Sequence, residues 1–142
     1  MDFFVDAIFE EIEKKERAAH KIYHKLAKLL KNEDDKKNIL MLADQELAHD
    51  NFFSSSKKKT VADVSEEELR KLAIFIQSKD LSDSNNVKEL LSFAINEEKK
   101  AEESYRILAE HIADEDAKKH LLKIAEHEKH HAKVLERIAS HL

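Results

Sequence analysis

Apolar residues recur along most of the chain at alternating spacings of three and four, a pattern typical of amphipathic helices in a bundle. Four long segments show this pattern. They predict helices at about residues 2–31, 34–54, 86–112 and 114–142. A shorter apolar stripe follows Ser65, which forms a predicted capping box with Glu68. The pattern predicts an all-α four-helix bundle, with a short additional helix between the second and third long helices.

The connections between the helices are of two lengths. The breaks near Asn32 and Asp114 are short, and these residue types cap helices or tolerate left-handed backbone without glycine. Each flanking pair of helices should therefore be antiparallel. The connection at about residues 55–85 is long enough to cross the bundle. We interpret the 142 residues as one domain of two helical hairpins, at about 2–54 and 86–142.

The two predicted hairpins repeat each other. Shifted by 82 residues, the first aligns on the second without a gap, and thirteen of 34 positions between Glu16 and His49 are identical to their partners. Tyr23 and Tyr105, the only tyrosines of the chain, are such a pair. This repeat predicts a bundle with a pseudo-two-fold axis.

The composition excludes several classes of protein. The chain has no glycine and no proline, which disfavours phosphate-cradling loops, dinucleotide fingerprints, nucleophile elbows and tight hairpin turns. It has no cysteine, so disulfides, iron–sulfur clusters and thiolate zinc sites are excluded. The net charge of −5 argues against nucleic acid or an anionic membrane as a partner. No apolar run approaches the roughly 18 residues that span a bilayer, and the acidic N-terminus is unlike a secretory signal. We expect a soluble, cytoplasmic protein.

Each long helix carries polar side chains in the middle of its otherwise apolar stripe. They are Glu16, Glu46 with His49, Glu98, and Glu128 with His131. Four carboxylates inside one bundle cannot all stay ionised without a counter-charge, because an unpaired buried charge destabilises the fold. The carboxylates must either take up protons or bind cations. A buried polar network that binds no metal is therefore one interpretation.

A dimetal centre is the interpretation that these residues favour. Two divalent cations would neutralise four carboxylates, and Glu-x-x-His places both side chains on one helix face. One glutamate on each of two helices and Glu-x-x-His on the other two form the ligand set of a carboxylate-bridged dimetal centre. The assigned roles are bridging for Glu46 and Glu128, capping for His49 and His131, and terminal for Glu16 and Glu98. Oxygen and imidazole ligands together favour two iron ions, manganese, or a mixed iron–manganese pair.

The two tyrosines belong to the same pattern. Tyr23 and Tyr105 lie seven residues, or two helical turns, after Glu16 and Glu98. From there their hydroxyls can donate hydrogen bonds to ligand carboxylates and orient them. The histidines other than His49 and His131 are interpreted as polar surface residues, although His20 with His24 and His127 with His131 have a spacing that could chelate a metal.

These residues resemble the ferritin-like superfamily and, within it, the rubrerythrin-like di-iron proteins. The resemblance covers the four long helices, and its motifs are the two pairs of glutamate and tyrosine and the two Glu-x-x-His motifs. It implies a ferritin-like bundle with a crossover between the second and third helices. It also implies a di-iron oxidoreductase, a peroxidase or oxidase that reduces hydrogen peroxide or dioxygen in oxidative-stress protection. A homodimer is implied as well, and the long connection would allow helices to be exchanged between subunits.

The sequence departs from the rubrerythrin pattern in two respects. Rubrerythrins carry a rubredoxin-like domain with four cysteines, whereas this chain has none and would need an external electron donor such as a rubredoxin-like protein. Rubrerythrins also tend to have a further glutamate three residues after the third-helix ligand, where this chain has Ala101. Glu102, or His20 at the matching position of the first helix, could substitute for it as an extra metal ligand.

Two other functions stay open at this stage. Ferritin-like oxidation and storage of iron predicts a shell of many subunits and continuous iron uptake. A non-enzymatic metal-binding bundle predicts bound metal without redox turnover. The size of the assembly separates the first from an oxidoreductase, and turnover separates the second.

Overall fold

The computed structural model describes residues 2–56, 65, 67–68, 72 and 83–142. In this part of the chain there are four long helices and no strand: α1 (Asp2–Leu29), α2 (Glu33–Ser56), α4 (Val87–His111) and α5 (Glu115–Ser140). The predicted all-α class and the four long helices are thus confirmed. Their ends differ from the predicted ones by no more than two residues.

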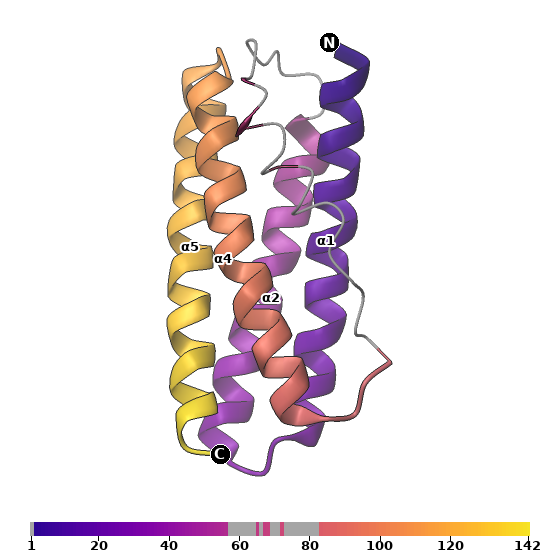
Figure 1. Ribbon diagram of the computed structural model, residues 1–142, viewed down its shortest axis with the longest axis vertical. Helices are drawn as coiled ribbons and strands as arrows, with labels where there is room; N and C mark the ends of the chain where they lie inside the picture. Colours follow the sequence, from indigo (N-terminus) through magenta and orange to yellow (C-terminus); the bar gives the residue numbers. More distant parts are fainter. Residues whose placement is uncertain (1, 57–64, 66, 69–71, 73–82) are drawn as a thin grey trace.

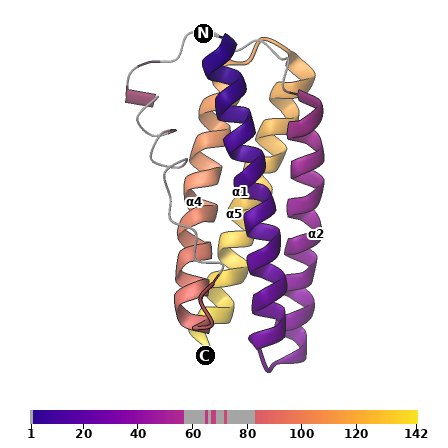
Figure 2. The same ribbon diagram turned by 90° about the vertical axis from the view of Figure 1, so that its right-hand side faces the viewer.

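The helices lie side by side in one bundle (Figure 1). Helices α1 and α2 form one antiparallel hairpin, and α4 and α5 form the other (Figures 1 and 2). Helices α2 and α4 run in the same direction, so α2 ends at the opposite end of the bundle from the start of α4. Most of the chain between them lies outside the described residues, and so does most of the predicted short helix. Its predicted cap is visible, because the amide of Glu68 donates to Ser65 Oγ at 3.2 Å.

Three polar side chains start helices in a chain that has no glycine. The amides of Asp34 and Asp35 donate to Asn32 Oδ1 at 2.9 and 3.1 Å. Asn86 caps α4 and Asp114 caps α5 in the same way, each by accepting a hydrogen bond from the amide three residues later. No described residue has a positive φ. The breaks near Asn32 and Asp114 therefore work by capping and not by left-handed backbone.

The core consists of two apolar clusters at different heights in the bundle. One includes Tyr105, Leu108, Leu121 and Ile124, and the other includes Tyr23, Leu26, Leu42, Leu91 and Leu135. Most of the apolar residues on the inner faces of the helices are buried there, whereas the C-terminal Leu142, which the predicted helix at 114–142 includes, is 50% exposed. No described helix is long and apolar enough to cross a membrane.

Candidate metal centre

A polar layer lies between the two apolar clusters. The six residues in it are Glu16 of α1, Glu46 and His49 of α2, Glu98 of α4, and Glu128 and His131 of α5. None of them is more than 3% exposed. They point inward because they continue the apolar stripe of each helix, which faces the bundle axis. The structure thus brings together all six residues that the sequence singled out as metal ligands.

The six side chains form two overlapping groups. The first contains Glu16, Glu46, His49 and Glu128, and the second contains Glu46, Glu98, Glu128 and His131. Within each group, one potential ligand atom from every residue lies within 4.8 Å of the others. Glu46 and Glu128 belong to both groups, as ligands that bridge two metals would. Each group also holds one histidine and one glutamate of its own, as the assigned roles require.

The two imidazoles face the carboxylates with the same ring nitrogen. His49 Nδ1 lies 3.0 Å from Glu128 Oε1 and 3.5 Å from Glu16 Oε2. His131 Nδ1 lies 2.9 Å from Glu46 Oε1 and 3.4 Å from Glu98 Oε2. The rings stack with an angle of 16° between their planes. Nδ1 is therefore the nitrogen that each histidine would offer to a metal.

The outer nitrogens of both rings have partners across the bundle. His131 Nε2 lies 2.5 Å from Gln45 Oε1, and His49 Nε2 lies 3.1 Å from His127 Nδ1. An amide oxygen only accepts, so His131 Nε2 carries the proton and Nδ1 keeps its lone pair for the centre. The same arrangement at His49 requires His127 Nδ1 to be the acceptor. Such outer partners fix the tautomer and orientation of a ligating histidine.

Sequence reasoning missed both Gln45 and His127. It treated His127 as a surface residue, whereas its ring stacks on His49 with centroids 5.4 Å apart. Burial, followed by the neighbouring histidines His49 and His131, lowers the pKa of His127, which favours the neutral ring. The repeat could have revealed both residues, since positions 45 and 127 are repeat partners that directly precede the shared glutamates.

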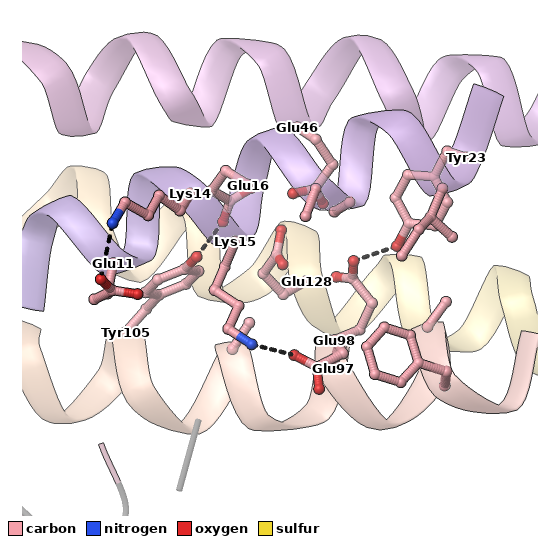
Figure 3. A pocket seen from close by; sticks show the side chains of 16 residues that line it. Glu11, Lys14, Lys15, Glu16, Tyr23, Glu46, Glu97, Glu98, Tyr105 and Glu128 are labelled. Carbon is pink, nitrogen blue, oxygen red and sulfur yellow. Dashed lines mark hydrogen bonds and ion pairs between the residues drawn. The ribbon is translucent and has the colours of Figure 1, made fainter. Parts of the chain in front are cut away.

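The tyrosines hold the remaining two carboxylates in a crossed arrangement. The Tyr23 hydroxyl of α1 donates to Glu98 Oε1 of α4, and the Tyr105 hydroxyl of α4 donates to Glu16 Oε1 of α1 (Figure 3). Burial, strengthened by the nearby carboxylates, raises the pKa of both hydroxyls well above the usual value. Both tyrosines therefore stay protonated, and each ties one hairpin to the other through the polar layer.

The carboxylates of the layer do not titrate alike. Burial, together with repulsion from the other glutamates, raises the pKa of Glu46 and Glu128 well above the ordinary value. Burial acts on Glu16 in the same direction, but its close contacts with Glu46 and His49 outweigh it and lower the pKa of Glu16. Protons on the two shared glutamates thus reduce the repulsion when no cation does so.

The layer contains buried ligand atoms that no hydrogen bond satisfies. Within the described residues, Glu16 Oε2, Glu98 Oε2, Glu128 Oε1 and His49 Nδ1 are fully buried, and none makes a hydrogen bond of suitable geometry, although His49 Nδ1 lies close to Glu128 Oε1 and Glu16 Oε2. Buried polar atoms of a native protein normally find a partner. All four atoms face the interior of the layer, where a cation would bind to their lone pairs. This donor set fits a pair of metal ions better than a closed hydrogen-bond network.

The two further candidate ligands lie outside both groups. Glu102 Oε2 accepts two hydrogen bonds from the Arg106 guanidinium, at 2.9 and 3.0 Å, and Arg106 also reaches Glu126. His20 contacts His24 edge-to-face, with ring centroids 4.5 Å apart. Neither residue contributes to the two ligand groups.

The bundle and its layer define the class of ferritin-like four-helix proteins with a carboxylate–histidine centre. The rubrerythrin family model matches residues 8–139, almost the whole chain. The chain belongs to the rubrerythrin family. No curated protein and no solved structure gives a significant match. The family and the buried cluster of glutamates and histidines together fit a di-iron site.

Proposed function

We propose that this protein is a di-iron oxidoreductase that reduces hydrogen peroxide or dioxygen with electrons from an external donor. The observation that carries the proposal is the pair of overlapping ligand groups that share Glu46 and Glu128, in a chain of the rubrerythrin family. Mixed oxygen and imidazole ligation suits iron or manganese better than calcium, magnesium or metals that prefer thiolate ligands. Two ferrous ions bound there would supply the two electrons that cleave an O–O bond.

The residues of the layer would have distinct tasks. Glu46 and Glu128 would hold both metals, because each lies in both groups. Tyr23 and Tyr105 would keep Glu98 and Glu16 oriented while retaining their own protons. Two apolar clusters above and below the layer would shield it from water along the bundle axis. Electrons would come from outside these 142 residues, because they contain no cysteine for a rubredoxin-like iron site. A protein of this activity would protect cells against peroxide.

Metal analysis tests the site. Protein purified without a tag and loaded with ferrous iron under anaerobic conditions should hold about two metal ions per chain. Glu46→Ala combined with Glu128→Ala should abolish stoichiometric binding, because both groups lose their shared carboxylates. Asp44→Asn is the matched control, since Asp44 is an exposed carboxylate on the same helix. Wild-type protein that binds no metal would leave a protonated polar core and contradict the proposal.

A single-turnover reaction tests the activity. Protein loaded with ferrous iron should consume about one hydrogen peroxide per pair of irons, and water should be the product.

Light scattering after chromatography should give about twice the 16.5 kDa of one chain, as expected for a homodimer. A shell of many subunits with continuous iron uptake would instead indicate a ferritin-like storage protein. Bound metal without peroxide consumption would indicate a non-enzymatic bundle.

A further inference from the structure

A cavity of about 270 Å³ opens from the polar layer towards the surface between α1 and α4. Its inner end is formed by the carboxyl groups of Glu16, Glu46, Glu98 and Glu128 (Figure 3). The two tyrosines line the same end. Any small molecule in this cavity would therefore lie directly against the proposed metal ligands.

Small side chains on the two helices create this space. The apolar part of its wall consists of Ala18, Ala19, Ile22, Phe93, Ala94 and Ala101. Ala19 and Ala101 are repeat partners, and each lies three residues after a terminal glutamate of the layer. That position shares a helix face with the glutamate, so a longer side chain there would fill the cavity beside the centre.

The cavity is much larger than hydrogen peroxide requires. A water molecule takes up about 30 Å³ in the liquid, and a cavity of about 150 Å³ with apolar walls binds benzene. The volume beside the layer thus suffices for a benzene ring that carries a short substituent. Its apolar wall offers no hydrogen bonds to a chain of water molecules, whereas it would favour a hydrocarbon group.

Near the mouth of the cavity, the positive charges of two lysines are balanced by the negative charges of neighbouring glutamates. Lys15 Nζ lies 4.0 Å from Glu97 Oε2, and Lys14 Nζ lies 3.1 Å from Glu11 Oε1 (Figure 3). Because each lysine has a carboxylate beside it, the mouth presents no excess positive charge to an anion. The inner end, with its four carboxyl groups, disfavours an anion as well. An uncharged guest suits both ends.

We propose that this cavity binds the apolar body of an organic hydroperoxide, and that its hydroperoxide group lies against the polar layer. The inference rests on the proposed function and names alkyl and aryl hydroperoxides as a substrate class besides hydrogen peroxide. In the reaction the O–O bond of ROOH breaks. Two electrons, from the bound ferrous ions and ultimately from the external donor, and two protons give ROH and water.

Binding to the metal-free protein tests the cavity independently of activity. The probe is cumyl alcohol, the product expected from cumene hydroperoxide, and its binding is followed by NMR line broadening and titration calorimetry. Wild-type protein should bind it, and Ala101→Leu and Ala18→Leu should weaken binding by at least about tenfold by filling the space. Ala139→Leu, at an exposed alanine of α5, is the matched control and should bind like wild type. Circular dichroism verifies that each variant is folded, and Ala18, which is only half-buried, provides a milder change than Ala101.

Single turnover of the iron-loaded protein tests the substrate class. Cumene hydroperoxide should give cumyl alcohol, and Ala101→Leu should slow this reaction at least about tenfold more than it slows the consumption of hydrogen peroxide. No binding of cumyl alcohol, or equal binding by wild type and Ala101→Leu, would overturn the inference. The proposed function would still stand after either of these results, provided that the iron-loaded protein consumes hydrogen peroxide. Consumption of neither hydroperoxide would overturn both.

Discussion

At the scale of single residues, the centre depends on side chains that a list of metal ligands would omit. His127 and Gln45 contact the outer nitrogens of His49 and His131, and the contacts cross from one hairpin to the other. Because each contact is made by the outer nitrogen Nε2, the inner nitrogen Nδ1 of each histidine faces the carboxylates. The partners differ in one respect, since Gln45 offers a fixed acceptor, whereas His127 accepts only while its Nδ1 is unprotonated.

Removal of the His127 acceptor should weaken metal binding. We expect His127→Leu to lower the affinity for ferrous or manganous ion by about tenfold to a hundredfold, because His49 loses the partner that orients it. His127→Gln should restore much of the affinity, since it places the residue type of the repeat partner at this position. Competition with a chelator measures both values. His130→Gln, at an exposed neighbouring histidine, is the control, and an unchanged affinity in His127→Leu would show that the contact does not position His49.

The raised pKa values of Glu46 and Glu128 predict how the metal-free protein responds to pH. When the pKa of a carboxyl group is higher in the folded protein than in the unfolded chain, the group contributes its full stabilisation at a pH below its ordinary pKa of 4.5. This contribution is lost as the pH rises through the pKa of the group in the folded protein. Glu46→Gln keeps a neutral side chain at every pH. In the absence of metal, it should therefore raise Tm relative to wild type more at about pH 7.5 than at about pH 5.

Calorimetry of chelated protein across this range measures the difference. Asp44→Asn should show no such divergence, because Asp44 is exposed on the same helix. A Glu46→Gln variant whose Tm follows that of wild type at every pH would mean that Glu46 does not become charged in the metal-free fold.

At the scale of helices, the sequence predicts the elements well because its signals are local. Apolar spacing and helix caps depend only on neighbours along the chain. The side chains of Asn32 and Asp114 accept hydrogen bonds from helix amides, as expected, and that of Asn86 does so as well. The six inward polar residues could be predicted for the same reason, because any residue on the apolar stripe of a bundle helix faces its axis.

Contacts between helices were harder to predict than the helices themselves. The sequence places Tyr23 two turns after Glu16, yet the hydroxyl of Tyr23 reaches Glu98 of the other hairpin. The link from Glu102 to Arg106 is local, but its extension to Glu126 of α5 is not. The cavity depends on how closely α1 and α4 approach each other, which spacing along one helix does not determine. The cluster of six inward polar residues was therefore predictable, whereas its outer partners and the cavity beside it were not.

At the scale of the whole molecule, the polar layer is where the two hairpins meet. Each ligand group takes side chains from three helices, and both groups need α2 of one hairpin and α5 of the other. The tyrosines connect α1 with α4 at the same height. Without a cation, this layer brings carboxyl groups together at a cost in free energy. With cations, the same residues would join both hairpins, so metal binding and the stability of the bundle should be coupled.

Metal loading should therefore stabilise the entire bundle and not only the residues around the layer. A ligand at about a thousand times its dissociation constant stabilises the folded state by about 4 kcal/mol, which corresponds to a rise in Tm of about 10 °C for a domain of this size. Manganous ion is the suitable probe, because it adds the charge of a ferrous ion without oxidation in air. Glu16→Gln, which removes a carboxylate from one group only, should reduce the rise, and Asp44→Asn should keep it in full. Both hairpins should unfold in one transition at the higher temperature, as followed by calorimetry and by the NMR signals of amides in each hairpin. If manganese stabilised the protein equally in Glu16→Gln, or if one hairpin melted at its metal-free temperature, the ions would not bind across the bundle in the proposed layer.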